Sequence, residues 1–149
     1  MVLGRLADRV NRDTVRDVVL PELDAGRVLP AFASAMVWGY GTAGYGPTRV
    51  RWVLTGVRGR ATLHAPVLAT VSERLSAAVE RVRTGGPIDA FRLMNNEGHI
   101  KYLGGAFFTK WLYFASAVNG ADDPAAAPIL DKHVRDWPCC LMSRCARVR

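Results

Sequence analysis

The stretch that most constrains this 149-residue chain is Gly98–Val118, which reads GHIKYLGGAFFTKWLYFASAV. Two adjacent glycines, Gly104–Gly105, interrupt it, and such a pair favours a turn over a continuous helix. We therefore predict a short helix at Ile100–Leu103 and a longer, strongly apolar helix from about Ala106. A helix this apolar needs burial on most of its surface, so we expect the rest of the chain to be organised around it.

Lys110 is the single charged residue of that apolar helix. Its ammonium group either reaches water or loses part of its hydration among the neighbouring rings, and partial desolvation lowers the pKa of a lysine. The position near the start of a helix acts in the same direction, because the helix dipole disfavours a second positive charge there. A neutral lysine is a nucleophile, so Lys110 is a candidate for covalent chemistry. The aromatic neighbours are Phe107, Phe108, Trp111, Tyr113 and Phe114.

A purely structural Lys110 fits the same pattern. On a helical wheel Lys110 falls beside Ala106, Tyr113 and Ala117, on the less apolar edge of the helix. A lysine in that position usually extends its stem along the surface and keeps its charge in water. The sequence physics leaves both interpretations open. The main apolar stripe of this helix consists of Leu103, Phe107, Trp111, Phe114 and Val118.

The remaining chain is dominated by helical periodicity and lacks a convincing pair of alternating strands. We predict an all-α domain over residues 1–137 and an atypical tail over residues 138–149, whose cysteine- and arginine-rich composition differs from the rest. The other expected helices are one carrying Val10, Val15, Val18 and Val19 and closed by Pro21, one opened by Pro30, one from Pro47 to Gly56, one over Pro66–Arg83, and one begun by Pro87.

The formal charge of +7 favours a polyanionic partner, either nucleic acid or an anionic membrane surface. No run of eighteen apolar residues is present, so we predict no membrane span. The amino-terminal stretch lacks the apolar core of a signal peptide, and this indicates a cytoplasmic protein.

The cysteines give no sign of a disulfide framework or a metal site. Cys139, Cys140 and Cys145 cluster near the end of the chain, and three is an odd number. Their spacing with His133 matches no common zinc pattern, so we predict no metal ligands.

A glycine-rich stretch, Trp38–Pro47, reads WGYGTAGYGP and is predicted to be a loop between two helices. Trp38, Tyr40 and Tyr45 offer flat faces on which an unstacked nucleotide base could lie. Packing of the tyrosines onto the core explains them equally well.

The order of features in Gly98–Val134 resembles a known family. A glycine-containing hairpin precedes a helix with Thr109-Lys110 near its start, and Asp131 follows in the sequence Ile-Leu-Asp-Lys-His. This arrangement resembles the helix-hairpin-helix DNA glycosylases and looks most like their 8-oxoguanine DNA glycosylase branch. The motif itself corresponds to residues 98–118. Family members continue beyond the aspartate, so the resemblance implies a carboxy-terminally truncated form.

The resemblance also implies roles for particular residues. Lys110 matches the catalytic lysine that attacks the sugar and forms a Schiff base, and Asp131 matches the aspartate that assists it. The backbone amides of the hairpin would hold a DNA phosphate, which assigns DNA binding to Gly104, Gly105, Ala106 and Phe107. Trp38, Tyr40 and Tyr45 would then line a base pocket. The implied protein is a monomer that acts on double-stranded DNA containing a damaged base, without a cofactor or a metal, at the nucleoid of a bacterial cytoplasm.

The hairpin departs from the family pattern in one respect. The usual Leu-Pro-Gly-x-Gly-x-Lys is replaced by Leu103-Gly104-Gly105-Ala106-Phe107-Phe108-Thr109-Lys110, with one extra residue and a phenylalanine near the second glycine. This departure favours a different kind of protein, a basic helical DNA-binding module or an inactive glycosylase relative. A small helical protein-interaction domain is a third possibility, but it leaves the pair Lys110 and Asp131 without a role.

Overall fold

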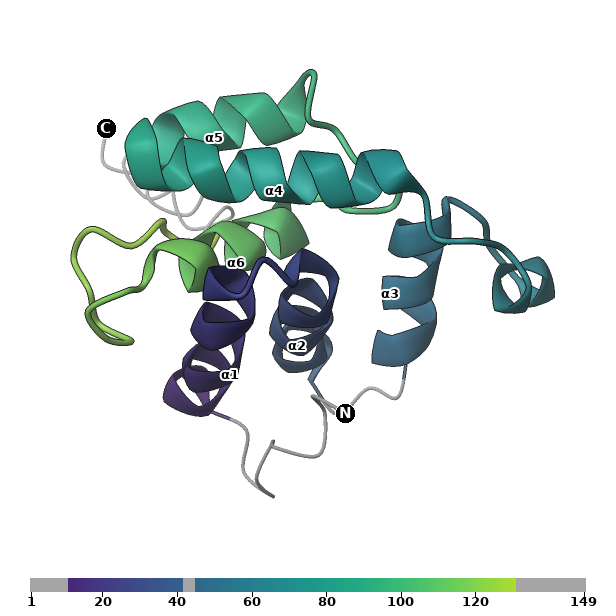
Figure 1. Ribbon diagram of the computed structural model, residues 1–149, viewed down its shortest axis with the longest axis horizontal. Helices are drawn as coiled ribbons and strands as arrows, with labels where there is room; N and C mark the ends of the chain where they lie inside the picture. The colour runs from purple at the N-terminus through teal and green to yellow at the C-terminus, as the bar shows by residue number, and fades with distance from the viewer. Residues whose placement is uncertain (1–10, 42–44, 131–149) are drawn as a thin grey trace, which may run out of the picture.

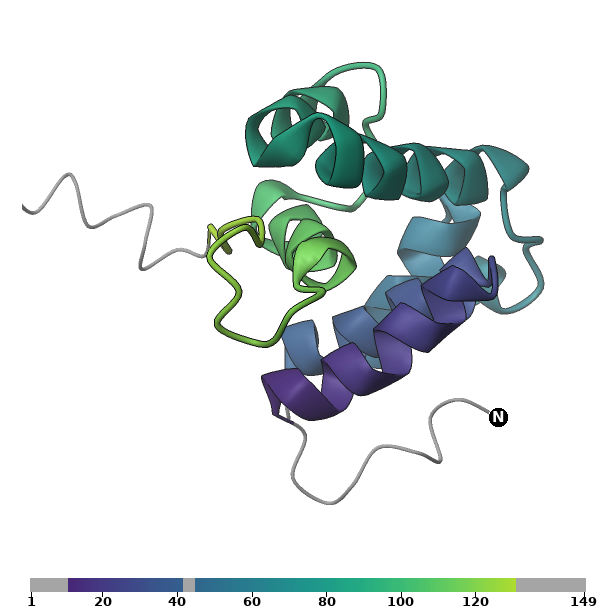
Figure 2. The ribbon, with the colours of Figure 1, turned by 60° about the vertical axis from the view of Figure 1, so that its left-hand side comes forward.

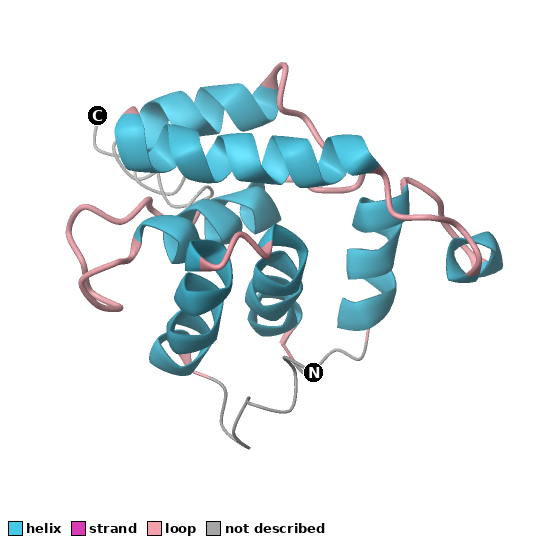
Figure 3. Ribbon diagram, in the orientation of Figure 1, coloured by secondary structure: helices cyan, strands magenta, loops and turns pink. Residues whose placement is uncertain are grey.

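A computed structural model describes residues 11–41 and 45–130 of the chain, and this part is helical without a strand (Figure 3). The all-α prediction is confirmed. Residues 131–149 lie outside the described part, so the division into a domain and a tail stays a prediction. The helices are α1 (Arg12–Asp24), α2 (Val28–Tyr40), α3 (Gly46–Thr55), a 3₁₀ helix η2 (Arg60–Leu63), α4 (Ala69–Thr84), α5 (Gly86–Asn95) and α6 (Gly105–Ser116).

Helix α6 lies in the middle of the molecule. The pair α4 and α5 lies on one side of it and the pair α1 and α2 on the other, and α6 contacts all four (Figures 1 and 2). Trp111 and Phe114 of α6 are fully buried. The ring of Trp111 meets Phe32 of α2 edge-on at 5.6 Å, and its indole N–H donates to the Leu75 carbonyl of α4 at 3.4 Å. The apolar helix is therefore the core around which the other helices pack.

The prediction of a short helix at Ile100–Leu103 is wrong. These residues form a turn in which Ile100 and Leu103 are buried, and Tyr102 adopts a left-handed φ of 69°. Four residues are too few to offset the cost of starting a helix, whereas two buried apolar side chains hold the turn in place. The two helices joined by the hairpin are consequently α5 and α6, and the hairpin itself is Asn96–Gly104.

Three other helix boundaries differ from the prediction. Helix α2 begins at Val28 and not at Pro30. Pro21 does not close α1, which continues to Asp24 with Pro21 inside it. The lost hydrogen bond lies near the end of the helix, where the full burial of Val15 and Val19 holds the segment. Helix α4 begins at Ala69 and not at Pro66. The backbone N–H of Leu68 donates to the carbonyl oxygen of Leu54 in α3 at 2.9 Å, and this contact keeps the residues before α4 extended.

The helices at Pro47 and Pro87 are confirmed. Each proline occupies the first turn of its helix, where a missing N–H costs nothing. Gly56 ends α3 in a left-handed conformation with φ of 69°, as expected for a glycine just after a helix.

Replacing Trp111 with alanine should reduce the free energy of unfolding by about 3–5 kcal/mol, because the cavity would open between three helices. The matched control is Val118→Ala, since Val118 is 54% exposed and its truncation should cost less than about 0.5 kcal/mol. Urea unfolding followed by circular dichroism measures both. Similar losses in the two variants would contradict a core centred on α6.

Candidate functional site

Lys110 lies on the side of α6 that faces the end of α2. Its side chain is half-buried, and the Nζ atom donates to the carbonyl oxygen of Gly39 at 3.1 Å. The same nitrogen lies 4.9 Å from the ring centroid of Phe107 and 5.8 Å from that of Trp38. A Cβ at position 39 would come within 3.2 Å of the Lys110 Cδ atom. The glycine therefore leaves room for the lysine stem between the two helices.

Two of the three aromatic residues expected in a loop, Trp38 and Tyr40, belong to helix α2, which extends to Tyr40. Tyr40 stacks on Phe107 with centroids 4.3 Å apart and planes at 30°, and Trp38 meets Phe114 edge-on at 5.4 Å. Burial raises the pKa of the Tyr40 hydroxyl, and the nearby Arg49 acts in the opposite direction. The end of α2 thus packs against α6 through two aromatic contacts.

Tyr45 differs from these two aromatic residues. It precedes α3 and is 66% exposed, so its ring is available to solvent. Trp38 and Tyr40 pack onto the core, because each ring contacts an aromatic side chain of α6. The role of the three residues in binding a base stays a prediction.

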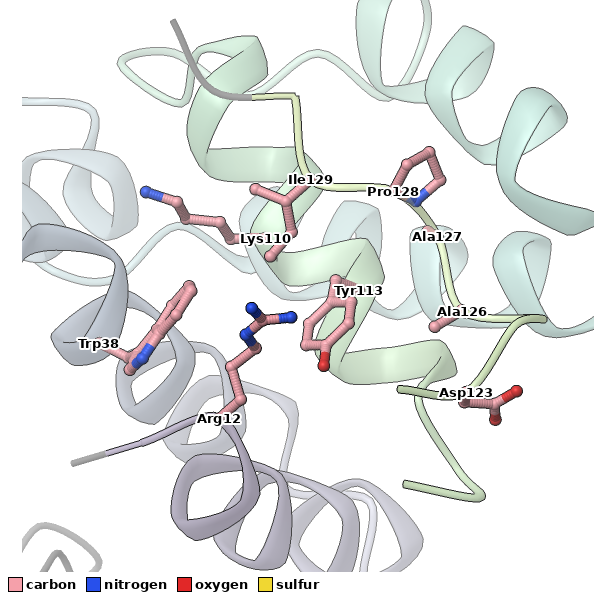
Figure 4. Close-up of a pocket in the computed structure, with 9 residues that line it drawn as sticks. All are labelled: Arg12, Trp38, Lys110, Tyr113, Asp123, Ala126, Ala127, Pro128 and Ile129. Atoms are coloured by element: carbon pink, nitrogen blue, oxygen red, sulfur yellow. The ribbon is translucent and has the colours of Figure 1, made fainter. Parts of the chain in front are cut away.

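A hollow of about 460 Å³ opens beside Lys110 (Figure 4). Trp38, Lys110 and Tyr113 line it together with Arg12, whose guanidinium group extends between the Trp38 and Tyr113 rings in the view. The hollow therefore combines aromatic walls with two cationic side chains. Its other wall is the segment that follows α6 and consists of Asp123, Ala126, Ala127, Pro128 and Ile129.

Arg12 and Tyr113 were not predicted as site residues. Tyr113 follows Lys110 by three residues and lies on the same edge of the helical wheel, so the spacing could have indicated it as a site residue. Arg12 begins α1, far from α6 in the sequence, and only the packing of α1 against α6 brings it to the hollow. No local pattern in the sequence could have selected it.

The chain returns to α6 after the loop and passes beside Lys110. The backbone N–H of Leu130 donates to the Thr109 hydroxyl oxygen at 3.1 Å, and that hydroxyl donates to the Gly105 carbonyl at 2.8 Å. Thr109 is only 2% exposed, so this contact is sheltered from water. Leu130 is the last described residue before Asp131, which lies outside the described part of the chain. The residue next to the candidate lysine therefore anchors the segment that leads to the candidate aspartate.

Asp123 is the described carboxylate that lines the hollow, but its role is to shape the loop. Its two oxygens accept hydrogen bonds from the backbone N–H groups of Asn119 at 3.0 Å and Ala125 at 2.9 Å. These bonds hold the pKa of the Asp123 carboxyl below its usual value. In Figure 4 its side chain points away from Lys110. Asp123 is thus a loop residue and no substitute for Asp131.

The amides assigned to phosphate binding lie at the start of α6. Gly104 is extended and precedes the helix, and no side chain among the described residues caps it. The N–H of Phe107 donates to the Gly104 carbonyl at 2.9 Å, so this amide is used within the helix. Gly105 and Ala106 occupy the first helical positions, where amides have no intrahelical acceptor. Phosphate binding by Gly104, Gly105, Ala106 and Phe107 stays a prediction.

Residues 2–145 match the family described as "Putative 8-oxoguanine DNA glycosylase OGG-like protein". The chain belongs to this family. The match covers the site, α6 and the segment after it, and it confirms the resemblance drawn from Lys110 and the hairpin. No curated protein and no solved structure matches the chain.

Membership in the OGG-like family gives the protein a role related to DNA glycosylases and makes DNA its expected partner. Within residues 11–41 and 45–130, no helix is long and apolar enough to cross a membrane. In the same ranges, no group of three His, Cys, Asp or Glu side chains is placed to hold a metal ion.

Removing the Thr109 hydroxyl should loosen the segment that returns to the site. In Thr109→Val the Leu130 amide loses its acceptor, at a cost of about 1–2 kcal/mol, and should exchange its hydrogen faster. Thr109→Ser keeps the hydroxyl and serves as the control. NMR measures the hydrogen-exchange rate of the Leu130 amide in each variant. Equal exchange rates in Thr109→Val and the unsubstituted protein would show that this bond does not hold the segment.

Proposed function

We propose that this OGG-like protein excises an oxidised purine, with 8-oxoguanine as the first candidate, from double-stranded DNA through a Schiff base on Lys110. The observation that carries the proposal is the position of Lys110. Lys110 lines a hollow together with Trp38 and Tyr113, in a chain of the OGG-like family. An amine nucleophile, an aromatic wall and a DNA partner are the three requirements of this reaction.

The reaction begins when the damaged nucleotide leaves the stack, at a cost of roughly a few kcal/mol. The neutral amine of Lys110 attacks C1′ of the sugar, the bond from C1′ to the base breaks, and the base leaves with the electron pair and takes up a proton. The amine loses its proton, the sugar ring opens and a Schiff base remains. Removal of a proton from C2′ then allows β-elimination of the 3′ phosphate, which nicks the strand.

The contacts around Lys110 position the nucleophile in this scheme. Rings at 4.9 and 5.8 Å displace water from one side of the ammonium group. These cation–π contacts stabilise the ammonium form, so a base must take a proton from it before the attack. The carbonyl of Gly39 holds the side chain in one direction, so the amine has a defined position before DNA binds.

Asp131 is the proposed partner of Lys110. It follows Leu130, whose N–H donates to Thr109, and Thr109 directly precedes Lys110. This hydrogen bond anchors the chain up to Leu130 beside the lysine-bearing turn, and it supports the choice of Asp131 as the residue that follows in the sequence. A carboxylate there stabilises the positive charge that develops on the sugar and relays protons between the amine and the departing base.

The base itself is proposed to enter the hollow, against Trp38. Arg12 adds hydrogen-bond donors that suit the carbonyl oxygens of an oxidised purine, and Tyr113 adds an aromatic wall. Tyr40 supports the site from behind through its stack on Phe107. Tyr45, with its exposed ring, is proposed to meet the DNA next to the extruded base.

The hairpin is proposed to hold the DNA without reading its sequence. The amides of Gly104, Gly105 and Ala106 lie before and at the start of α6, where the positive end of the helix dipole favours a phosphate. The amide of Phe107 already has an acceptor, so it is less suited to a phosphate. The main contribution of Phe107 is its ring, which contacts Lys110.

A second candidate function is a DNA-binding module without chemistry. The observation that favours it is the hydrogen bond from Lys110 to Gly39, because a purely structural lysine would hold the end of α2 in the same way. The departure of the hairpin from the family pattern points in the same direction. Covalent trapping separates the two functions.

A duplex containing 8-oxoguanine, incubated with the protein and borohydride, should give a covalent protein–DNA adduct, because reduction fixes a Schiff base. Lys110→Gln should abolish the adduct, with less than about 1% of the original amount remaining, while DNA binding persists. The matched control is Lys101→Gln at saturating duplex, which removes the same charge from an exposed lysine and should still trap. Denaturing gels quantify all three.

The outcomes are distinct. An adduct that survives in Lys110→Gln would place the nucleophile elsewhere, at the amino terminus or Lys101. An unsubstituted protein that binds the duplex and traps neither 8-oxoguanine nor an abasic site would favour the non-catalytic module.

Asp131→Asn should slow the release of the base by about 10²–10⁴-fold, which is the usual contribution of a positioned acid or base. The amine remains, so trapping at a preformed abasic site should change far less. Single-turnover assays on 8-oxoguanine and abasic duplexes measure the two steps separately. Asp123→Asn is the control, because that carboxylate binds the loop backbone. Equal effects of both substitutions would remove Asp131 from the mechanism.

A further inference from the structure

A second cluster of aromatic and cationic side chains lies where α3 meets the hairpin, Asn96–Gly104. The guanidinium carbon of Arg58 lies 4.4 Å from the ring centroid of Tyr102 and 5.3 Å from that of Trp52. The Nζ atom of Lys101 lies 4.9 Å from the same Tyr102 centroid. We call these four residues the Arg58–Lys101 cluster. It belongs to α3, to the loop after α3 and to the hairpin, and it does not line the hollow beside Lys110.

The cluster is held in place by backbone contacts on two sides. Lys101 donates from Nζ to the Gly56 carbonyl at 3.2 Å, and this ties the hairpin to the end of α3. Arg74 of α4 donates to the His99 carbonyl and ties the hairpin to a second helix. The rings of Trp52 and Tyr102 meet at 63° with centroids 6.5 Å apart. The two cations therefore sit on a fixed platform and not at the ends of unrestrained side chains.

The positive charge of the cluster is not balanced by a carboxylate in the described part of the chain. None of the ion pairs there includes Arg58 or Lys101. The two aromatic rings lie against the Arg58 guanidinium group, whose five N–H donors form a planar fork suited to an anion. Lys101 uses one donor on Gly56 and has three in all. Two cations that share one aromatic ring repel each other, and an anion between them relieves the repulsion.

We infer that the Arg58–Lys101 cluster binds backbone phosphates of the DNA duplex next to the lesion. A guanidinium fork and an ammonium group with open donors are the side chains that grip phosphate oxygens. The hairpin that carries Lys101 and Tyr102 leads directly into α6, so a duplex held there lies near the helix of Lys110. The inference rests on the proposed DNA partner but needs no chemistry at Lys110. The cluster adds affinity without reading the base sequence.

The test is the salt dependence of binding to an undamaged duplex. The logarithm of the association constant falls with the logarithm of the salt concentration, with a slope of about 0.9 for each phosphate contact. Arg58→Gln and Lys101→Gln should each reduce the magnitude of that slope by about 0.9, and the double variant by about twice as much. Fluorescence anisotropy at several salt concentrations gives the slopes, and far-UV circular dichroism verifies the fold of each variant.

Arg81→Gln is the matched control. Arg81 is an exposed arginine of α4 that lies two turns, about 10 Å, beyond Arg74 and away from the hairpin. Its replacement by glutamine removes one positive charge, as the cluster substitutions do. Its slope should match that of the unsubstituted protein. A slope reduced equally in Arg81→Gln would mean that only net charge matters and would overturn the cluster as a site.

The remaining outcomes separate this inference from the proposed enzyme. Unchanged slopes in folded Arg58→Gln and Lys101→Gln overturn the inference and leave the trapping result untouched. Reduced slopes in a protein that traps no adduct support the cluster and count against the glycosylase. Cluster substitutions that abolish binding to vesicles of anionic lipid but not to the duplex would reassign the surface to a membrane and overturn the inference.

Discussion

The burial of helix α6 is the constraint on which the rest of the structure depends. A helix with aromatic residues on most of its circumference is stable in water only when other helices cover it, and here α1, α2, α4 and α5 do so. Trp111 and Phe114 are fully buried within that cover. Because Lys110 is part of the same helix, the energy that folds the protein also sets the position of the candidate nucleophile.

The neighbourhood of Lys110 follows from how closely α2 approaches α6. Gly39 has no side chain to separate the two helices, and its carbonyl meets the lysine amine at 3.1 Å. Tyr40 and Trp38 then pack on Phe107 and Phe114 on either side of that contact. This arrangement suits both a structural lysine and a nucleophile. The aromatic wall of the hollow is the reason that we propose a nucleophile.

The hairpin connects the two surfaces that we assign to DNA. Its later part starts α6 and leads to Lys110, while its earlier part carries Lys101 and Tyr102 toward α3. Contacts to the phosphate backbone supply affinity and orientation, whereas the hollow would supply discrimination of the base. Such a division lets one rigid element position a duplex relative to the helix that carries the nucleophile.

The amino-acid sequence by itself determined the all-α class, the helices opened by Pro47 and Pro87, and the central apolar helix with its single lysine. Local chemistry controls these features, through proline at helix starts, glycine after helix ends and the spacing of apolar residues. The motif of Lys110 and Asp131 also sufficed to indicate the family.

Only the tertiary structure decided the course of the hairpin and the membership of the site. Ile100 and Leu103 looked helical, but their burial against the core favours a turn over a helix too short to support itself. Trp38 and Tyr40 looked like loop residues, yet packing against α6 extends α2 through them. Arg12 reaches the hollow because α1 packs on α6, a contact between segments distant in the chain. Such contacts depend on how the faces of separate helices fit together, and local sequence patterns do not record that fit.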